Sequence, residues 1–514
     1  MSEPTVSMTP AARRLLIASL MLATVIYTLD TTIANVALPH MQGSMQASHE
    51  QIAWVLTSYI VVSAIVTPLT GFLSQRFGQR RLLLLCVGGF TVASMLCGLA
   101  TTLPQIVVCR MLQGAFGAGL VPISQTVLLS VYPREHYGSA TAIWGMGIMV
   151  GPILGPTLGG WLTEMYGWRW VFFINLPVGV LALVGIAASI PRDRPDRVKV
   201  FDGLGYGLLA LAIGAFQLCI DRGNREDWFD STEIRLTAFA SVLFLYMFVV
   251  HSLSSPNPFL DRALFRDRNF VVGATLIFAL GLMMLSTMVL MPGFLETLQG
   301  YPVSTVGWLL APRGVGTMLT MFLVARLTHR IDARLLAGAG LGFIAISMLQ
   351  MASFNAEVGW KAVAWSGFVQ GLGMGLTFVP VTTAAFMTLE PRLRAEASAL
   401  FSLLRNLGAG IGISVVVTLL ARDLQANQAR LVEHLGVFDG GKWLGAEDVV
   451  GTTLAPHLLA AEVQRQAASI AYANEFVVMI VVTAVALPLL LLMRIPRREE
   501  SATNGGGSLP AAAD

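Results

Sequence analysis

Two ionisable residues interrupt long apolar runs and could exchange a proton. Asp30 lies inside the run at residues 15–37, and Arg110 lies inside the run at residues 104–130. A charge within the hydrocarbon of a membrane is costly, so such residues are candidates for functional sites. A neighbouring arginine favours the ionised carboxylate, whereas burial favours the neutral acid. A changing balance between these effects would let Asp30 bind and release a proton. A static ion pair that joins two helices is the alternative.

Further polar and aromatic residues in the apolar runs could line a cavity for bulky lipophilic or cationic ligands. Tyr27 precedes Asp30 by three residues and therefore shares its helix face. Arg313 and Arg405 each lie well inside an apolar run, where they could line a polar cavity or bond backbone carbonyls. The candidate cavity residues are Tyr27, Asn35, Tyr59, Gln113, Trp144, Arg313, Trp365 and Arg405.

A stripe of small residues marks the apolar run at residues 138–162. Glycines that recur every four residues let another helix approach closely, and prolines bend a helix by removing backbone donors. The pattern predicts a hinge or seal, with an ordinary packing groove as the alternative. The stripe consists of Gly147, Gly151, Pro152, Gly155, Pro156, Gly159 and Gly160.

A basic turn follows the second apolar run, over residues 71–81. Its arginines could bind carboxylates or helix C-termini in one conformation only, or they could simply set the membrane topology. The residues of this turn that we single out are Gly71, Arg76, Gly78, Arg80 and Arg81.

The elements that must position these residues are transmembrane helices. Charged residues make up 12% of the 514 residues, against about 25% in soluble domains, and the mean hydropathy is +0.69. A span needs roughly 20 mainly apolar residues. Fourteen runs qualify, which predicts an all-α integral membrane protein. The expected spans are 15–37, 52–74, 82–102, 104–130, 138–162, 169–190, 203–220, 235–253, 270–295, 304–327, 333–352, 361–388, 397–421 and 476–494.

Basic residues predict the orientation of these spans. With a cytoplasmic N-terminus, 21 Lys and Arg fall on the cytoplasmic side and 9 on the outer side. Lys and Arg are enriched on the cytoplasmic side of membrane proteins. An even number of spans then places both termini in the cytoplasm.

Two halves of the chain resemble each other. Phe72, Leu73, Arg76 and Arg80 recur 250 residues later, and Gln113-Gly114 is echoed by Gln370-Gly371. Repeated halves around a central site are an arrangement of transporters. We therefore expect six helices in residues 1–190, two linker helices in 191–269 and six helices in 270–494. The last of these parts includes a long outer loop over residues 422–475, in which we expect two further helices. The composition of residues 495–514 predicts a disordered tail.

Several other classes of protein are disfavoured. The net charge of +3 gives no basic face for nucleic acid, and no residue pattern indicates a metal site or a cofactor. Gly436-x4-Gly441-Lys442 is nearly a phosphate-binding loop, but Trp443 occupies the Ser/Thr position, which argues against an ATP-driven pump. No nucleophile–base pair supports a membrane enzyme or receptor.

These motifs together resemble the major facilitator superfamily, specifically the fourteen-helix drug/proton antiporters of the EmrB/QacA type. The resemblance rests on five stretches, which are Leu29–Pro39, Gly71–Arg81, Arg110 with Gln113-Gly114, Gly147–Gly160, and Trp168–Pro177. It looks closest to the EmrB branch because of Asp221-Arg-Gly, Asp227-Trp-Phe229 and the long loop before the last helix.

The resemblance implies a major facilitator fold with 6+2+6 helices in a bacterial inner membrane. It implies proton transfer at the fourth-helix motif, export of lipophilic or amphipathic drugs, and partners that include a periplasmic membrane-fusion adaptor and an outer-membrane channel. An exporter of fatty acids, siderophores or another metabolite is the alternative. One residue departs from the family pattern: Gln75 stands where an acid is usual. A latch at this turn would then depend on Arg76 and Arg80.

Overall fold

Helices make up the architecture of this chain. The structure is a computed structural model that describes residues 9–190, 200–328, 331–433 and 455–494, and these residues form no strand. Thirteen of their helices are long and apolar enough to cross a membrane. A further span is completed by α2 (His49–Val66) and α3 (Leu69–Phe77), which meet at a bend of 57°. The predicted fourteen-span, all-α membrane fold is therefore confirmed.

The first group of helices, here called the N-terminal bundle, packs α1 against α7 and α9, and α5 against α2 and α4. Proline and glycine divide some spans into two helices, as at Pro68 between α2 and α3 and at Gly119 before α6. The remaining members of the bundle are α1 (Pro10–Ser44), α4 (Gln79–Leu99), α5 (Leu103–Gly117), α6 (Leu120–Val131), α7 (Tyr137–Tyr166), α8 (Trp170–Phe173) and α9 (Asn175–Ser189).

The second group, the C-terminal bundle, repeats this pattern. It packs α16 against α14 and α15, and α13 against α17, and α19 closes its edge. Its members are α13 (Arg268–Thr297), α14 (Val303–Leu327), α15 (Ala333–Ala352), α16 (Trp360–Met387), α17 (Arg394–Glu433) and α19 (Ala455–Leu489). The short α12 (Ala263–Arg266) leads into it.

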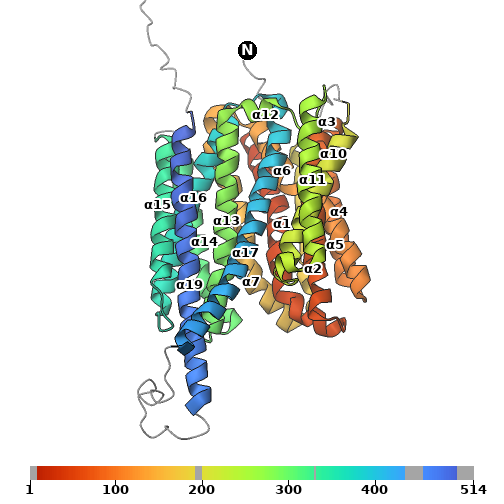
Figure 1. Ribbon diagram of the computed structural model, residues 1–514. Helices are drawn as coiled ribbons and strands as arrows, with labels where there is room; N and C mark the ends of the chain where they lie inside the picture. Colours follow the sequence, from red (N-terminus) through yellow and green to blue (C-terminus); the bar gives the residue numbers. More distant parts are fainter. Residues whose placement is uncertain (1–8, 191–199, 329–330, 434–454, 495–514) are drawn as a thin grey trace, which may run out of the picture.

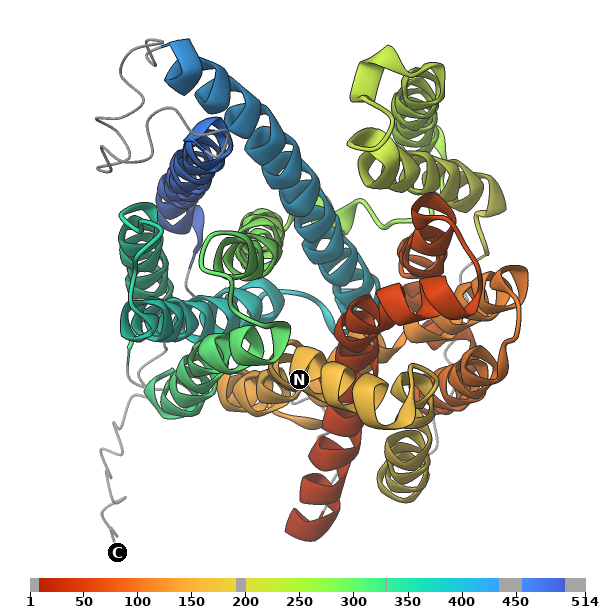
Figure 2. The ribbon, with the colours of Figure 1, turned by 90° about the horizontal axis from the view of Figure 1, so that it is seen from below.

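Two helices separate the bundles in sequence. They are α10 (Gly203–Gly223) and α11 (Thr232–Ser254), which pack against each other, and α10 also contacts α2 and α17. Seen from below, this pair lies at the periphery of the molecule, while α17 crosses obliquely toward α1 (Figure 2).

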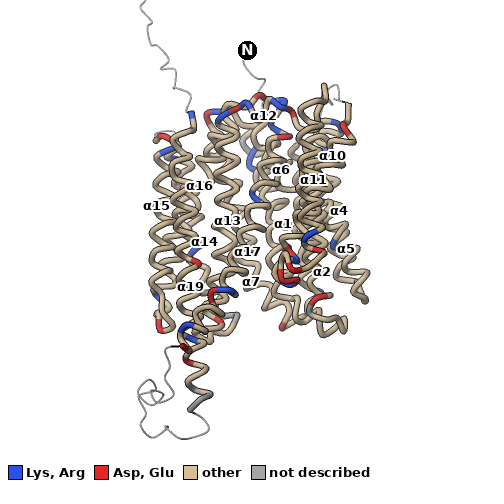
Figure 3. Tube along the Cα trace, in the orientation of Figure 1, with Lys and Arg blue, Asp and Glu red and all other residues tan. Residues whose placement is uncertain are grey.

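The end of the molecule that carries the chain's N-terminus, α3 and α12 is called the upper end (Figure 1). Lys and Arg gather there, although some also lie on the lower part of α17 (Figure 3). At the lower end, α17 and α19 project beyond the other helices (Figure 1).

The structure describes helix in both stretches where we expect helices within the outer loop, residues 422–475. The α17 helix continues unbroken to Glu433, and α19 already begins at Ala455. The apolar spacing did reveal helix in both stretches, but polar residues at the membrane boundary concealed that each stretch continues a span. The near phosphate loop at 436–442 and the tail at 495–514 lie outside the described residues.

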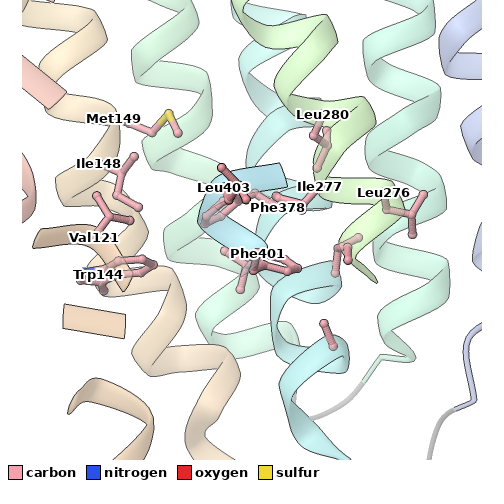
Figure 4. Close-up of a cluster of buried hydrophobic side chains, with 14 of the residues drawn as sticks. Val121, Trp144, Ile148, Met149, Leu276, Ile277, Leu280, Phe378, Phe401 and Leu403 are labelled. Carbon is pink, nitrogen blue, oxygen red and sulfur yellow. The ribbon is translucent and has the colours of Figure 1, made fainter. Parts of the chain in front are cut away.

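An apolar core joins the two bundles. Buried side chains from α6 and α7 meet side chains from α13, α16 and α17, with Trp144 facing the group around Phe401 (Figure 4). Because helices from both bundles supply this cluster, it fills the space between them and excludes water from it. The labelled members are Val121, Trp144, Ile148, Met149, Leu276, Ile277, Leu280, Phe378, Phe401 and Leu403.

Candidate functional site

Asp30 and Arg110 meet in a fully buried ion pair between α1 and α5. The Arg110 Nη1 lies 2.6 Å from Asp30 Oδ2, and both side chains are shielded from solvent. Gln113 Nε2 donates to Asp30 Oδ1 at 2.8 Å, and Asn175 Nδ2 donates to the same oxygen at 3.0 Å. Two helices, α5 and α9, thus supply three donors to this carboxylate.

The guanidinium of Arg110 is positioned from its other sides. Its Nε donates to the Val55 carbonyl of α2 at 3.1 Å, and Nη1 also reaches Gln113 Oε1 at 2.8 Å. The rings of Tyr59 and Phe172 lie with their centroids 4.2 and 5.7 Å from the guanidinium carbon. Such cation–π contacts stabilise a desolvated charge. Tyr59 and Gln113, which we expect in the substrate cavity, therefore lie beside the ion pair.

Asn175 belongs to this cluster but was not singled out from the sequence. Its amide also donates to Ser94 Oγ of α4 at 2.9 Å, so it links α9 and α4 to Asp30. The available signal was an amide within the apolar stretch Trp168–Pro177. A transmembrane amide of this kind is functional by default, but its partner could not be read from spacing.

The glycine stripe of α7 packs directly on the part of α1 that carries Asp30. A Cβ on Gly151 would lie 2.4 Å from the Thr28 carbonyl carbon, and one on Gly155 would lie 2.0 Å from Thr32 Oγ1. Thr32 Oγ1 donates to the Gly151 carbonyl at 3.0 Å. The stripe thus fixes the position of Asp30 relative to α7, while the same helix contacts α14 of the other bundle.

The C-terminal bundle contains a neutral counterpart of this site. Gln370 Nε2 donates to Thr287 Oγ1 at 3.0 Å, and both residues lie 257 positions after Gln113 and Asp30. By the same offset, Gly367 replaces Arg110. The repeat keeps the bond between the helices but removes both charges, so this ion pair belongs to the N-terminal bundle alone.

The remaining cavity candidates separate into two groups. Arg313, Arg405 and Tyr27 are partly buried side chains on helices at the interface of the bundles. The α14 helix, which carries Arg313, packs on α7, and Asn406, beside Arg405, donates to the Tyr27 hydroxyl. The other group is Asn35, which is exposed and bonds the Thr31 carbonyl of its own helix; Trp365, which is 58% exposed and stacks on Phe368; and Trp144, which is buried in the core. The structure does not bring this second group together with the first.

At the upper end, two arginines reach across the interface in a nearly symmetric way. Arg134 of the N-terminal bundle donates to the Met387 carbonyl at 3.2 Å, and Arg394 of the C-terminal bundle donates to the Leu129 carbonyl at 3.4 Å. Each carbonyl belongs to the last turn of a helix, which carries partial negative charge. We call these contacts, together with the packing of α3 on α17, the upper clamp.

The basic turn contributes to the upper clamp through a residue that we did not expect. A Cβ on Gly71 would lie 2.9 Å from the Glu396 Cα, so α3 and α17 touch through their backbones. Gln75 Nε2 donates to the Glu396 carboxylate and to the Arg392 carbonyl, both at 3.4 Å. Arg80 donates to Ala187 within its own bundle. The latch therefore includes Gln75 and does not rest on Arg76 and Arg80 alone.

Introducing an acid at position 75 is expected to weaken the upper clamp. Gln75→Glu places a second carboxylate beside Glu396, and partly screened like charges at this distance repel by about 1 kcal/mol. That energy corresponds to an approximately fivefold smaller ratio of molecules with the upper clamp formed to molecules with it broken. Electron–electron double resonance would measure this ratio through the distance between spin labels at Glu135, in the N-terminal bundle, and Leu335, in the C-terminal bundle. Adding Glu396→Gln is the control and should restore the wild-type distances; unchanged distances in Gln75→Glu alone would contradict the assignment.

Comparisons with known proteins agree with this architecture. A model of the family described as Major Facilitator Superfamily matches residues 20–413. The fatty acid resistance protein FarB of Neisseria gonorrhoeae is 38% identical over 81% of this chain and 82% of its own length. The multidrug export protein EmrB of Escherichia coli K12 is 35% identical over 82% and 83%. The crystal structure of the human organic anion transporter MFSD10 covers 92% of this chain and all of its own, with a TM-score of 0.58 at 13% identity.

Proposed function

This chain belongs to the Major Facilitator Superfamily, and from that premise we propose that it is a proton-driven exporter of lipophilic or amphipathic compounds. It is a multi-pass membrane transporter and not an enzyme. The observation that carries the proposal is the buried pair of Asp30 and Arg110, the described ion pair in which both partners are fully shielded.

Protonation of Asp30 would change the forces between α1 and α5. The ionised carboxylate attracts Arg110 and accepts bonds from Gln113 and Asn175. A proton on this carboxyl removes the charge that balances Arg110 in a medium of low dielectric. The contact between the two helices then loses its main attraction, which allows α1 to move relative to α5.

The glycine stripe provides the route from this site to the rest of the molecule. Because α7 packs tightly on α1 and also contacts α14, a displacement of α1 is passed to the interface of the two bundles. We propose that the two six-helix bundles rock about this interface, as in alternating access. The upper clamp and the apolar cluster of Figure 4 would close the upper side in the conformation described here.

We place the protein in the bacterial inner membrane with both termini in the cytoplasm. The excess of basic residues at the upper end supports this orientation. The upper clamp is then the cytoplasmic gate, and substrate leaves from the lower, periplasmic side.

We further propose that the lower extension meets a periplasmic adaptor, which in turn leads to an outer-membrane channel. The α17 helix has 40 residues, or about 60 Å at 1.5 Å per residue. This is twice the roughly 30 Å thickness of the hydrocarbon. Its lower end, with the start of α19, thus reaches well beyond the membrane and offers a surface to such a partner.

The name of one relative favours a second cargo. FarB is a fatty acid resistance protein, whereas EmrB is a multidrug export protein. Both are similar to this chain over most of its length, so fatty acids are the specific alternative to drugs as its substrates.

Transport by purified protein in liposomes tests this proposal. With a pH gradient imposed in the direction that drives protons toward the cytoplasmic face, we expect accumulation of a lipophilic test compound on the opposite side. Dissipating the gradient with a protonophore should abolish accumulation and leave binding intact. Accumulation that requires ATP, or that persists without the gradient, would defeat the proposal.

A further inference from the structure

The linker pair, α10 and α11, is joined to the C-terminal bundle by the turn at its lower end. The indole Nε1 of Trp228 in this turn donates to Thr418 Oγ1 of α17 at 3.0 Å. The hydroxyl of Thr418 also lies 3.5 Å from Asn224 Oδ1. One helical turn earlier on α17, Ser414 Oγ donates to the Ile220 carbonyl at 3.0 Å. We call these hydrogen bonds the lower latch.

The backbone of the turn is strained where Trp228 reaches α17. Asp227 and Trp228 have φ angles of 52° and 54°, in the left-handed region that bulky residues rarely adopt. The ring of Trp228 packs over Gly223, where an added Cβ would lie 2.9 Å from it. Such strain persists only where the surrounding structure imposes it, and it is concentrated in clamps and switch regions. The motif stretches Asp221-Arg-Gly and Asp227-Trp-Phe229 therefore build this contact.

The α10 helix is attached to the N-terminal bundle along its whole length. Near its start, the Tyr206 hydroxyl donates to the Ile65 carbonyl of α2 at 3.3 Å. In its middle, a Cβ on Gly214 would lie 3.1 Å from the side chain of Ile65, and near its end Asp221 accepts a hydrogen bond from Thr57 of α2. Figure 2 shows the linker pair beside α2. The lower latch, by contrast, is confined to the lower end of α10 and the turn that follows.

We infer that the lower latch is specific to one conformation: it forms while the upper clamp is closed and breaks in each transport cycle, which rests on the rocking of the bundles proposed above. An element fixed along its length to one bundle cannot keep hydrogen bonds of 3.0 Å to another bundle that tilts away from it. The α10 helix contacts both α2 and α17, which contact each other less. The linker pair thus connects the bundles on this side and stabilises the same conformation as the upper clamp.

Removing either partner of the bond between Trp228 and Thr418 tests the latch. Trp228→Phe and Thr418→Val should each lower the ratio of molecules with the upper clamp formed to molecules with it broken about fivefold, the effect of one lost hydrogen bond. The distance between spin labels at Glu135 and Leu335 measures this ratio for the full-length protein in lipid nanodiscs, without substrate or gradient. The double variant should match the single variants, because all of them remove the same bond.

Two matched substitutions are the controls for this measurement. Trp308→Phe and Thr275→Val make the same chemical changes at exposed positions on α14 and α13, and they should leave the ratio at its wild-type value. A wild-type ratio in both Trp228→Phe and Thr418→Val would overturn the inference and assign the strained turn to packing alone.

Disulfide cross-links test whether the latch opens during transport. Oxidation of Asn224→Cys with Thr418→Cys joins the linker pair to α17 and should lower export at least about tenfold, with recovery after reduction. Thr57→Cys with Asp221→Cys joins the pair to α2 instead, and its oxidised and reduced forms should export equally. Variants with one added cysteine, oxidised in the same way, control for bonds to the four native cysteines.

Either cross-link can contradict the inference. Export by the oxidised Asn224→Cys/Thr418→Cys protein at the rate of its reduced form would show that the contact with α17 never breaks. Loss of export on cross-linking to α2 would show that α10 moves against the N-terminal bundle, which would defeat the attachment on which the inference depends.

The lower latch and proton-driven export can fail separately. The spin-label ratio is measured without substrate or gradient, so it reports on the latch whether or not protons drive transport. A lowered ratio in a protein that fails to export uphill would sustain the latch and defeat proton-driven export. Uphill export with an unchanged ratio would do the reverse.

Discussion

Asp30→Asn is expected to abolish uphill export while the protein still binds its substrate. Asparagine keeps the size of aspartate and can accept one hydrogen bond, but it neither carries charge nor takes up a proton in the relevant range. Arg110 would remain buried without a counter-charge, which costs about 3 kcal/mol of stability. We expect a loss of gradient-driven accumulation of at least about 100-fold in liposomes, together with a lower melting temperature.

A double variant separates proton coupling from a merely structural ion pair. In Asp30→Asn with Arg110→Gln, both charges are gone and the amides can bond each other, so much of the stability should return. Export should not return, because nothing at the site titrates. Recovery of uphill export in this double variant would show that the pair only holds α1 and α5 together. Glu164→Gln on the exposed end of α7 is the control and should behave as wild type.

Gly155→Val is expected to have the second largest effect. A single Cβ at this position would already lie 2.0 Å from Thr32 Oγ1, and valine adds two methyl groups. The side chain of Thr32 cannot turn away without losing its bond to the Gly151 carbonyl. We expect α1 and α7 to separate, with a loss of about 2–3 kcal/mol in stability and at least about tenfold in export. Thermal unfolding in detergent and the liposome assay measure the two losses.

The same glycine stripe provides its own control. A Cβ on Gly160 would meet only Val36 Cγ1, at an ordinary contact distance of 4.0 Å. Gly160→Ala should therefore leave both stability and export near wild type, and alanine favours the helix. If Gly155→Val were as mild as Gly160→Ala, the stripe would not be the contact that transmits movement from Asp30.

The spans and the ion pair could be predicted from the sequence because both depend on local signals. Apolar runs report the helices, and a charge within such a run is conspicuous whatever surrounds it. Asp30 and Arg110 stand out in this way, and the structure shows them in direct contact at 2.6 Å.

The neighbours of the pair could not be predicted in the same way. Val55 contributes a backbone carbonyl, and every residue has one. Asn175 and Ser94 come from α9 and α4, and only the packing of those helices brings them to Asp30. Helical periodicity fixes which residues share a face, but it does not say which helix that face meets. For the same reason Trp365 was assigned to the cavity although it lies on the surface.

The neutral bond between Gln370 and Thr287 leaves the C-terminal counterpart of the ion pair with no charge to titrate. If Asp30 is the proton carrier, this pair of equivalent positions brings one proton inward per cycle. Exchange of that proton for a neutral compound moves one elementary charge, so the cycle would be electrogenic. At a resting potential of 100 mV, negative inside, this contributes about 2.3 kcal/mol per cycle. The voltage alone would then sustain export when the external medium is as alkaline as the cytoplasm.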